Sequence, residues 1–236
     1  KHRAADLGEL PAKQTDYEAR LQAITHGDEA IAAVATELTA TEEKAEELAR
    51  NIHATREKAA PTFNDAIQTT LARLGMPEAR FVVQLTPAPA LTPTGGDEID
   101  FLFTANGNFA PQKVERIASG GEISRVMLAL KALLAHRMEL PTIIFDEIDT
   151  GVSGRIADAM GEIIADLSQT MQVVDITHLP QVASKSDTHF VVYKDAEGSH
   201  IRRLDPEERI TEIAKMLSGS QITEAALAQA RILLDK

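Results

Sequence analysis

Apolar side chains recur at steps of three, four and seven over residues 12–60, a segment with no proline and one glycine. This spacing places them on one stripe of a helix, while charged residues such as Glu42 and Lys44 occupy the other side. A helix this long cannot bury so narrow a stripe alone, so the pattern predicts a coiled-coil arm that needs a partner helix. Gly27 either breaks this helix or is tolerated within it. The stripe consists of Leu21, Ile24, Ile31, Val34, Leu38, Ala45, Leu48 and Ile52.

A further amphipathic helix is predicted from Pro61 to Leu74, because Gly75 and the proline that follows it are typical of a helix end. Residues 81–85 and 99–103 have strand composition and are joined by a turn region rich in proline and glycine. This arrangement predicts an antiparallel pair. The resulting division is a coiled-coil arm over 1–60, a helical neck over 61–76 and a lobe over 77–236.

Helical and apolar strand patterns alternate through the second half of the chain. Continuous apolar strands alternating with helices predict an α/β fold in which a mostly parallel sheet is flanked by helices. The expected helices cover 123–138, 155–167, 207–217 and 223–234, and the expected strands cover 142–145, 172–177 and 190–193, the last turned toward Ile201.

Composition narrows the class of protein. A chain of 236 residues, 44% of them hydrophobic, can form one sizeable domain or a modest domain with an extension. The absence of cysteine excludes disulfides and thiolate metal sites and fits the cytoplasm. No apolar run approaches the ~20 residues of a membrane-spanning helix, and no signal-peptide core follows Lys1, so no membrane partner is expected. The missing initiator methionine suggests a fragment.

The net charge of −12 disfavours a broad nucleic-acid groove, because neutralising phosphates requires clustered lysine and arginine. Any DNA contact should therefore be local. The small basic cluster at Arg202 and Arg203 is interpreted as solvated surface.

The first candidate for chemistry is a glycine loop, Ser119-Gly120-Gly121-Glu122, at the point where a loop turns into a helix. Small residues there allow backbone N–H groups and the positive end of the helix dipole to face a phosphate. The chain contains no Gly-Lys-Ser or Gly-Lys-Thr, so the loop that would cradle the phosphates is missing from it.

Two adjacent carboxylates end the apolar strand at 142–145, where ligands bind in open α/β sheets. Asp146 is assigned to Mg²⁺, held through water, and Glu147 is assigned to the attacking water as general base. The next strand leads to His178, whose neutral imidazole could hydrogen-bond a γ-phosphate or that water. The alternative interpretation is a solvated strand end with a structural histidine.

Taken together, these segments resemble ABC-type ATPases. The Ser119–Glu122 loop resembles the signature motif, the strand ending at Asp146 resembles Walker B, the glycine-rich turn at Asp149 resembles the D-loop, and His178 resembles the switch histidine. The amino-acid sequences of the three motifs resemble those of the bacterial RecN family, SMC-like ATPases of DNA repair. The resemblance covers essentially the whole chain. Ala118 stands where the wider ABC pattern has leucine.

The resemblance implies an ATPase head split between the two ends of a longer protein. An N-terminal half would hold the phosphate-binding loop and the antiparallel partner helix. Two heads of a homodimer would sandwich ATP, so that the Ser119–Glu122 loop of one meets the γ-phosphate bound on the other. The full-length protein would hydrolyse ATP with Mg²⁺ during recombinational repair of DNA double-strand breaks in the cytoplasm, associated with the nucleoid.

This interpretation leads to the expectation that the isolated chain binds ATP weakly and hydrolyses essentially none. Two alternatives remain at this point: a transporter-type ATPase subunit, which shares the catalytic motifs, and a non-catalytic coiled-coil interaction module.

Overall fold

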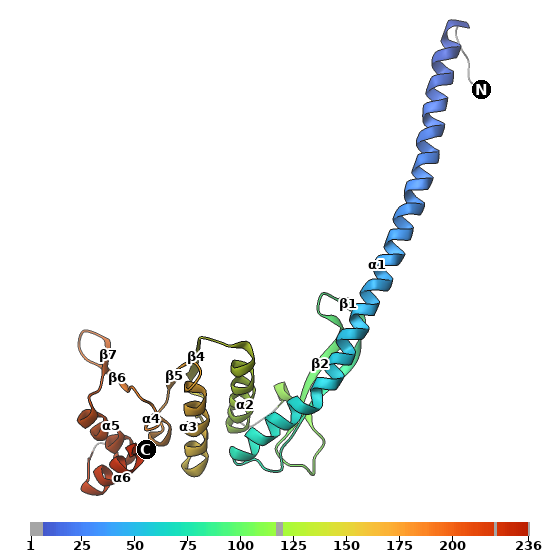
Figure 1. Cartoon of the computed structure of the whole chain (residues 1–236). Helices are drawn as coiled ribbons and strands as arrows, with labels where there is room; N and C mark the ends of the chain where they lie inside the picture. Colours follow the sequence, from blue (N-terminus) through green and yellow to red (C-terminus); the bar gives the residue numbers. More distant parts are fainter. Residues whose placement is uncertain (1–6, 117–119, 220, 236) are drawn as a thin grey trace. The chain divides into compact units, whose positions relative to one another are not determined.

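The computed structural model describes residues 7–116, 120–219 and 221–235. They form two compact units, and Figure 1 labels most of their helices and strands. One unit comprises the chain up to Lys58 together with Leu85–Glu98, and the other comprises Ala59–Gln84 together with the residues from Ile99 onward. The division into arm, neck and lobe stays a prediction.

Helix α1 runs without interruption from Leu10 to Arg73, after a short 3-10 turn at Leu7–Glu9. The prediction that a new helix begins at Pro61 is wrong, since this proline lies inside α1. A proline removes one hydrogen bond, to the carbonyl four residues earlier, and here the helix continues on both sides of that gap. Gly27 also lies inside α1 and is tolerated there.

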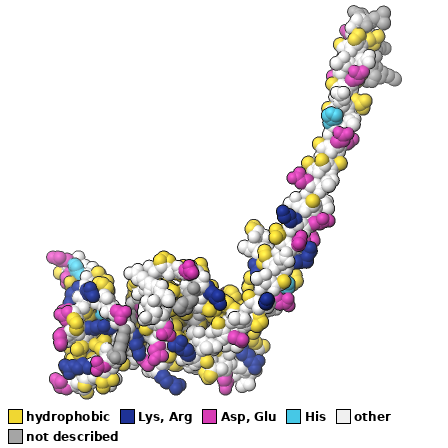
Figure 2. Space-filling model, viewed as in Figure 1, with side chains coloured by type: hydrophobic (Ala, Val, Ile, Leu, Met, Phe, Trp, Pro, Cys, Tyr) yellow, Lys and Arg dark blue, Asp and Glu magenta, His cyan; other side chains and the backbone are white. Residues whose placement is uncertain are grey.

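The apolar stripe of α1 is exposed in the first unit. Leu21, Ile31 and Val34 are 65%, 69% and 64% exposed, and Figure 2 shows hydrophobic side chains at intervals along this helix. Exposed apolar surface arranged at helical spacing is the kind that a second helix buries. The partner helix itself stays a prediction.

The tip of a β-hairpin packs on α1 within the first unit. Strands β1 (Arg80–Thr92) and β2 (Gly95–Thr104) are hydrogen-bonded neighbours joined by a two-residue turn. The Asp97 carboxylate, 4% exposed, accepts a 2.9 Å hydrogen bond from Arg56 Nη1 and lies 2.6 Å from His53 Nδ1. Arg56 Nη2 also donates to the Thr94 carbonyl at 2.6 Å. The hairpin tip is therefore held by a buried carboxylate between two basic side chains.

The base of the same sheet belongs to the second unit, where a short strand β3 (Gln112–Lys113) pairs antiparallel with β2. A 3-10 turn, Val114–Arg116, follows. Here Phe81 of β1 and Phe103 of β2 are buried in one cluster with Ile67 and Leu71 of α1. Side chains alternate between the two faces of a sheet, and these two lie on the face that α1 covers. The last turns of α1 are thus part of a helix-on-sheet core.

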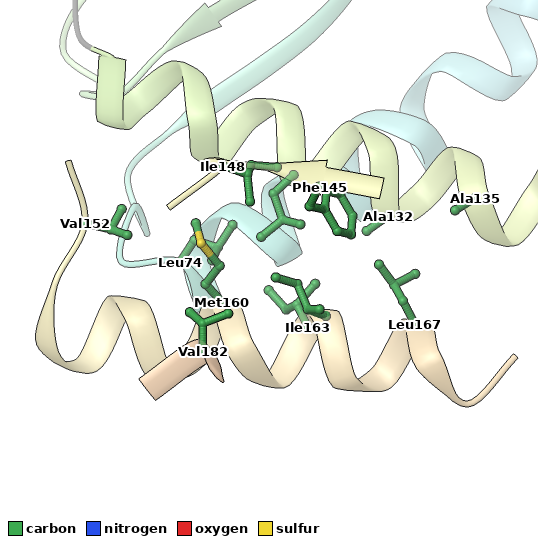
Figure 3. Packing of buried hydrophobic residues seen from close by; sticks show 12 residues of the cluster. Leu74, Ala132, Ala135, Phe145, Ile148, Val152, Met160, Ile163, Leu167 and Val182 are labelled. Carbon is green, nitrogen blue, oxygen red and sulfur yellow. The ribbon is translucent and has the colours of Figure 1, made fainter. Parts of the chain in front are cut away.

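The parallel part of the fold is a pair of strands, β4 (Thr142–Asp146) and β5 (Gln172–Ile176), in the register Ile144 opposite Val174. Helices α2 (Gly120–Met138) and α3 (Gly154–Ser168) pack together with the inward side of β4. Figure 3 shows Leu74, Met160 and Phe145 within this second core, so the residue that directly follows α1 belongs to it as well.

The remaining elements follow β5 in the order α4 (Pro180–Ala183), β6 (Phe190–Lys194), β7 (Ser199–Arg203), α5 (Pro206–Ser218) and α6 (Glu224–Leu234). In the described part of the chain β6 pairs only with β7, antiparallel. A capping box of Asp205 and Glu208 begins α5, which packs with α6 around Ile213. The α/β class and the long N-terminal helix are confirmed, although the parallel sheet has two strands here.

None of the helices within 7–116, 120–219 and 221–235 has the length and apolar character needed to span a bilayer.

Candidate active site

The two acids predicted for catalysis lie at the carboxyl edge of β4. Asp146 is the last residue of the strand and Glu147 follows it, and both are exposed. Glu147 adopts φ +48°, a left-handed backbone conformation that is uncommon for a residue with a side chain. Its N–H donates to the Ile176 carbonyl at 3.1 Å, and the Thr150 hydroxyl donates to its carbonyl at 2.9 Å. The ends of β4 and β5 are thereby joined at Glu147.

Asp149 lies behind this edge and is 1% exposed. One carboxylate oxygen accepts hydrogen bonds from the Thr177 hydroxyl and, at 3.3 Å, from the His178 N–H. The other lies 3.4 Å from His178 Nδ1. The second oxygen is buried and accepts no hydrogen bond from the described chain. The two bonds to the first oxygen fix the turn after β4 to the end of β5.

His178 lies at the same edge of the parallel pair as Glu147, since Asp146 is opposite Ile176 in the register. Its side chain is 66% exposed although its backbone is held by Asp149. An imidazole held at its base and open at its ring can meet a ligand arriving from solution. Its role in catalysis stays a prediction.

Three residues of the glycine loop, Gly120, Gly121 and Glu122, form the first turn of α2. A Cβ placed on Gly121 would lie 3.0 Å from the Gly151 carbonyl oxygen, and Gly151 itself has φ +76°. Only glycine allows so close a backbone approach. The glycine loop and the turn after β4 are therefore in contact, while the predicted Ser119 lies outside the described residues.

One acid near the site was missed by the sequence analysis. Asp175 on β5 is partly buried, and neither of its carboxylate oxygens has a hydrogen-bond partner in the described chain. Burial, and then the negative charge of Asp149, raise the pKa of the Asp175 carboxyl from 3.8 to about 7. A carboxylate between Val174 and Ile176, inside a mostly apolar strand, was the available signal.

No cluster of three or more metal-ligating side chains occurs among the described residues. Asp146 nevertheless offers an exposed carboxylate at a strand end, which suits Mg²⁺ because this ion retains most of its water ligands. The donor set therefore fits a magnesium ion held by one carboxylate, water and substrate phosphates.

Known proteins are similar to the chain in sequence, although no family model matches it. The chain is 41% identical over 192 residues to the DNA repair protein RecN of Rickettsia felis and 34% identical over 226 residues to that of Vibrio cholerae. These matches cover 80% and 92% of the chain. The chain belongs to the RecN family. It spans 35% and 41% of the length of these two relatives, so it corresponds to a part of such a protein.

Solved structures show the same fold at lower identity. The Smc head domain with a coiled coil and joint from Pyrococcus yayanosii matches 92% of this chain and 44% of that chain, with a TM-score of 0.58 and 18% identity. A second solved structure comes from work on ATP-driven dimerization and DNA stimulated activation of SMC ATPases. The match covers 72% of the present chain and 99% of the solved one, with a TM-score of 0.53 and 17% identity. The fold is that of an SMC-type head.

Proposed function

We propose that this chain is part of an SMC-like ATPase that acts in recombinational repair of DNA double-strand breaks. The observation that carries the ATPase proposal is the contiguity of the predicted site: Glu147 and His178 lie at one sheet edge, and the glycine loop touches the turn behind it. The repair role comes from the RecN relatives.

In this proposal each side chain has one task. The Glu147 carboxylate accepts a proton from the water that attacks the γ-phosphorus, and the bond to the ADP oxygen breaks. His178 hydrogen-bonds the γ-phosphate. Asp146 would hold Mg²⁺ through water, and the ion would supply positive charge that offsets the charge of the ATP phosphates. Asp149 acts indirectly, because it is buried and positions His178.

The rest of the ATP site is assigned to an N-terminal half of the same protein. Parallel sheets are normally covered on both faces, yet one face of the β4–β5 pair is open, with Ile144, Val174 and Ile176 60%, 42% and 53% exposed. On the β6–β7 hairpin Val192 and Ile201 are 71% and 67% exposed. These apolar faces and the stripe of α1 are the surfaces that the phosphate-binding lobe and an antiparallel helix would cover.

Assembly follows from the same scheme. Two heads of a homodimer would sandwich ATP, with Ser119, Gly120, Gly121 and Glu122 of one head meeting the γ-phosphate on the other. DNA contacts would be local, given the net charge of −12, in a cytoplasmic, nucleoid-associated protein. The 64 residues of α1 ahead of the glycine loop disfavour a transporter-type subunit.

The test is Glu147→Gln in the full-length protein. Loss of a general base typically lowers turnover by about 10²–10⁴-fold, so ATP hydrolysis should fall by at least about 100-fold while ATP binding persists. Glu162→Gln, an exposed glutamate on α3, is the matched control and should hydrolyse ATP normally. Undiminished turnover in the Glu147 variant would refute catalysis by this site. The isolated chain should bind ATP weakly by calorimetry.

A further inference from the structure

At the end of α1 the Leu74 carbonyl has no backbone donor among the described residues. The helix closes with a Schellman motif: the Met76 N–H donates to the Leu71 carbonyl at 2.9 Å, and the Gly75 N–H donates to the Ala72 carbonyl at 3.1 Å. Gly75 has φ +80°, as this motif requires. The two bonds satisfy earlier carbonyls, so the Leu74 carbonyl at the negative end of the helix dipole still needs a donor.

Arg125 of α2 supplies that donor. Its Nη1 donates to the Leu74 carbonyl at 3.2 Å, and its Nε donates to the Gly121 carbonyl at 2.9 Å. Both bonds are partly buried, which strengthens them relative to bonds in water. One planar guanidinium therefore links Leu74, the residue after α1, to the first turn of α2, which contains the last three residues of the glycine loop.

Core packing holds Leu74, whose carbonyl accepts the Arg125 hydrogen bond, in place. The Leu74 side chain is 0% exposed and belongs to the same core cluster as Leu128 of α2. Figure 3 shows it close to Met160 of α3. On the α2 end, Gly121 is in close contact with Gly151. A small displacement at either end would break an Arg125 hydrogen bond unless the other end moved with it.

We propose that Arg125 is a positioning residue that couples the base of α1 to the glycine loop. In this role it sets the first turn of α2, and with it Gly120 and Gly121, according to the position of the α1 terminus. The inference rests on the proposed function, since the loop affects turnover only if it meets a triphosphate. Neither Arg125 contact involves Asp146, Glu147 or His178.

The test compares Arg125→Gln, Arg125→Lys and the control Arg137→Gln in the full-length protein. Arg137 is an exposed arginine near the other end of α2, so its substitution removes the same charge from the same helix. Arg125→Gln should lower kcat roughly tenfold, the loss expected for a charged hydrogen bond, and leave KM for ATP nearly unchanged. Arg125→Lys should lose roughly threefold, because lysine lacks the rigid fork that bridges two carbonyls. Arg137→Gln should match the unsubstituted protein.

A double-mutant cycle with Gly75→Ala separates coupling from simple loss of structure. A Cβ at Gly75 would lie 3.1 Å from Ile156 and would strain the positive φ, so we expect this substitution to displace the adjoining Leu74 carbonyl. In the Gly75→Ala background Arg125→Gln should lower kcat by less than about twofold, because the bond is already lost. Unfolding midpoints show which variants are folded at the assay temperature, and if Arg125→Gln is unfolded, Arg125→Lys takes its place in the cycle.

The outcomes are distinct. Wild-type kcat in both Arg125 variants, or fully additive effects with Gly75→Ala, would overturn the coupling role while the result for Glu147→Gln stands. A raised KM with unchanged kcat would also overturn it, since that pattern assigns Arg125 to nucleotide binding. Absence of ATP hydrolysis by the unsubstituted full-length protein would instead overturn the proposed function.

Discussion

Asp175→Asn should stabilise the chain at neutral pH, which is unusual for a substitution beside a candidate active site. The Asp175 carboxyl has a pKa of about 7, compared with 3.8 for an ordinary aspartate. Between these pH values the native state holds a proton that the unfolded state has lost. The contribution of Asp175 to stability is therefore most favourable below pH 3.8, becomes less favourable as the pH rises toward 7, and is level above that value.

The size of the effect follows from the pKa. Each tenfold change in proton affinity corresponds to about 1.4 kcal/mol, so the full difference sets an upper limit of about 4 kcal/mol at pH 8. The partial exposure of Asp175 reduces the expected gain for asparagine to about 2 kcal/mol. At pH 4 the aspartate is mostly protonated in the folded chain, so the two proteins should differ much less.

Urea unfolding of the 236-residue chain at pH 4, 6 and 8 measures these differences. Asp65→Asn, at an exposed aspartate on α1, controls for the loss of one negative charge. A gain for Asp175→Asn that is equal at pH 4 and pH 8, or no gain at pH 8, would contradict a buried carboxyl that is protonated near neutrality.

Two further predictions concern the contacts that hold loops in place. Gly121→Ala should lower the unfolding free energy by about 1–3 kcal/mol through overpacking against Gly151, whereas Gly120→Ala, with no described atom within 4 Å of the added Cβ, should unfold like the original; equal losses in urea titrations would refute the contact. Asp97→Asn should speed hydrogen exchange at 85–98, because the hairpin tip loses the carboxylate that contacts Arg56 and His53. Hydrogen bonds from Arg56 and then from His53 lower the pKa of Asp97. The contribution of Asp97 to stability is present above pH 3.8 and lost as the pH falls through its lowered pKa. Unchanged exchange in the variant at pH 7 would contradict the role of Asp97 in holding the hairpin tip.

Periodicity in the sequence was sufficient to place most of the second-half elements. The helix predicted at 155–167 is Gly154–Ser168, and the strand predicted at 172–177 is Gln172–Ile176. The strand predicted at 190–193 and turned toward Ile201 is the β6–β7 hairpin. The parallel neighbour of β4 was harder to predict, because an apolar strand carries no local signal for its partner. The single helix through Pro61 was also missed, since the flanking residues favour helix strongly enough to span one lost hydrogen bond.

At the candidate site, the positions of the exposed side chains could be predicted from the ends of the strands. The contacts of the buried side chains could not be predicted from the sequence. Glu147 and His178 follow apolar strands, so the order of residues along the chain was sufficient to predict their common edge. The burial of Asp149 was not predictable in this way, because it depends on Thr177, a partner that is 28 residues away in the sequence. The bond from Arg125 to Leu74 spans 51 residues and has no local signature at all.

The left-handed backbone of Glu147 has a consequence for engineering. At φ +48° glycine or asparagine would relieve the conformational strain, so a procedure that selects variants for thermal resistance alone should favour those residues at this position. Such variants would gain thermal stability and would lose the Glu147 carboxylate. In the mechanism proposed above that carboxylate is the general base, so selection for thermal stability alone would act against ATP hydrolysis.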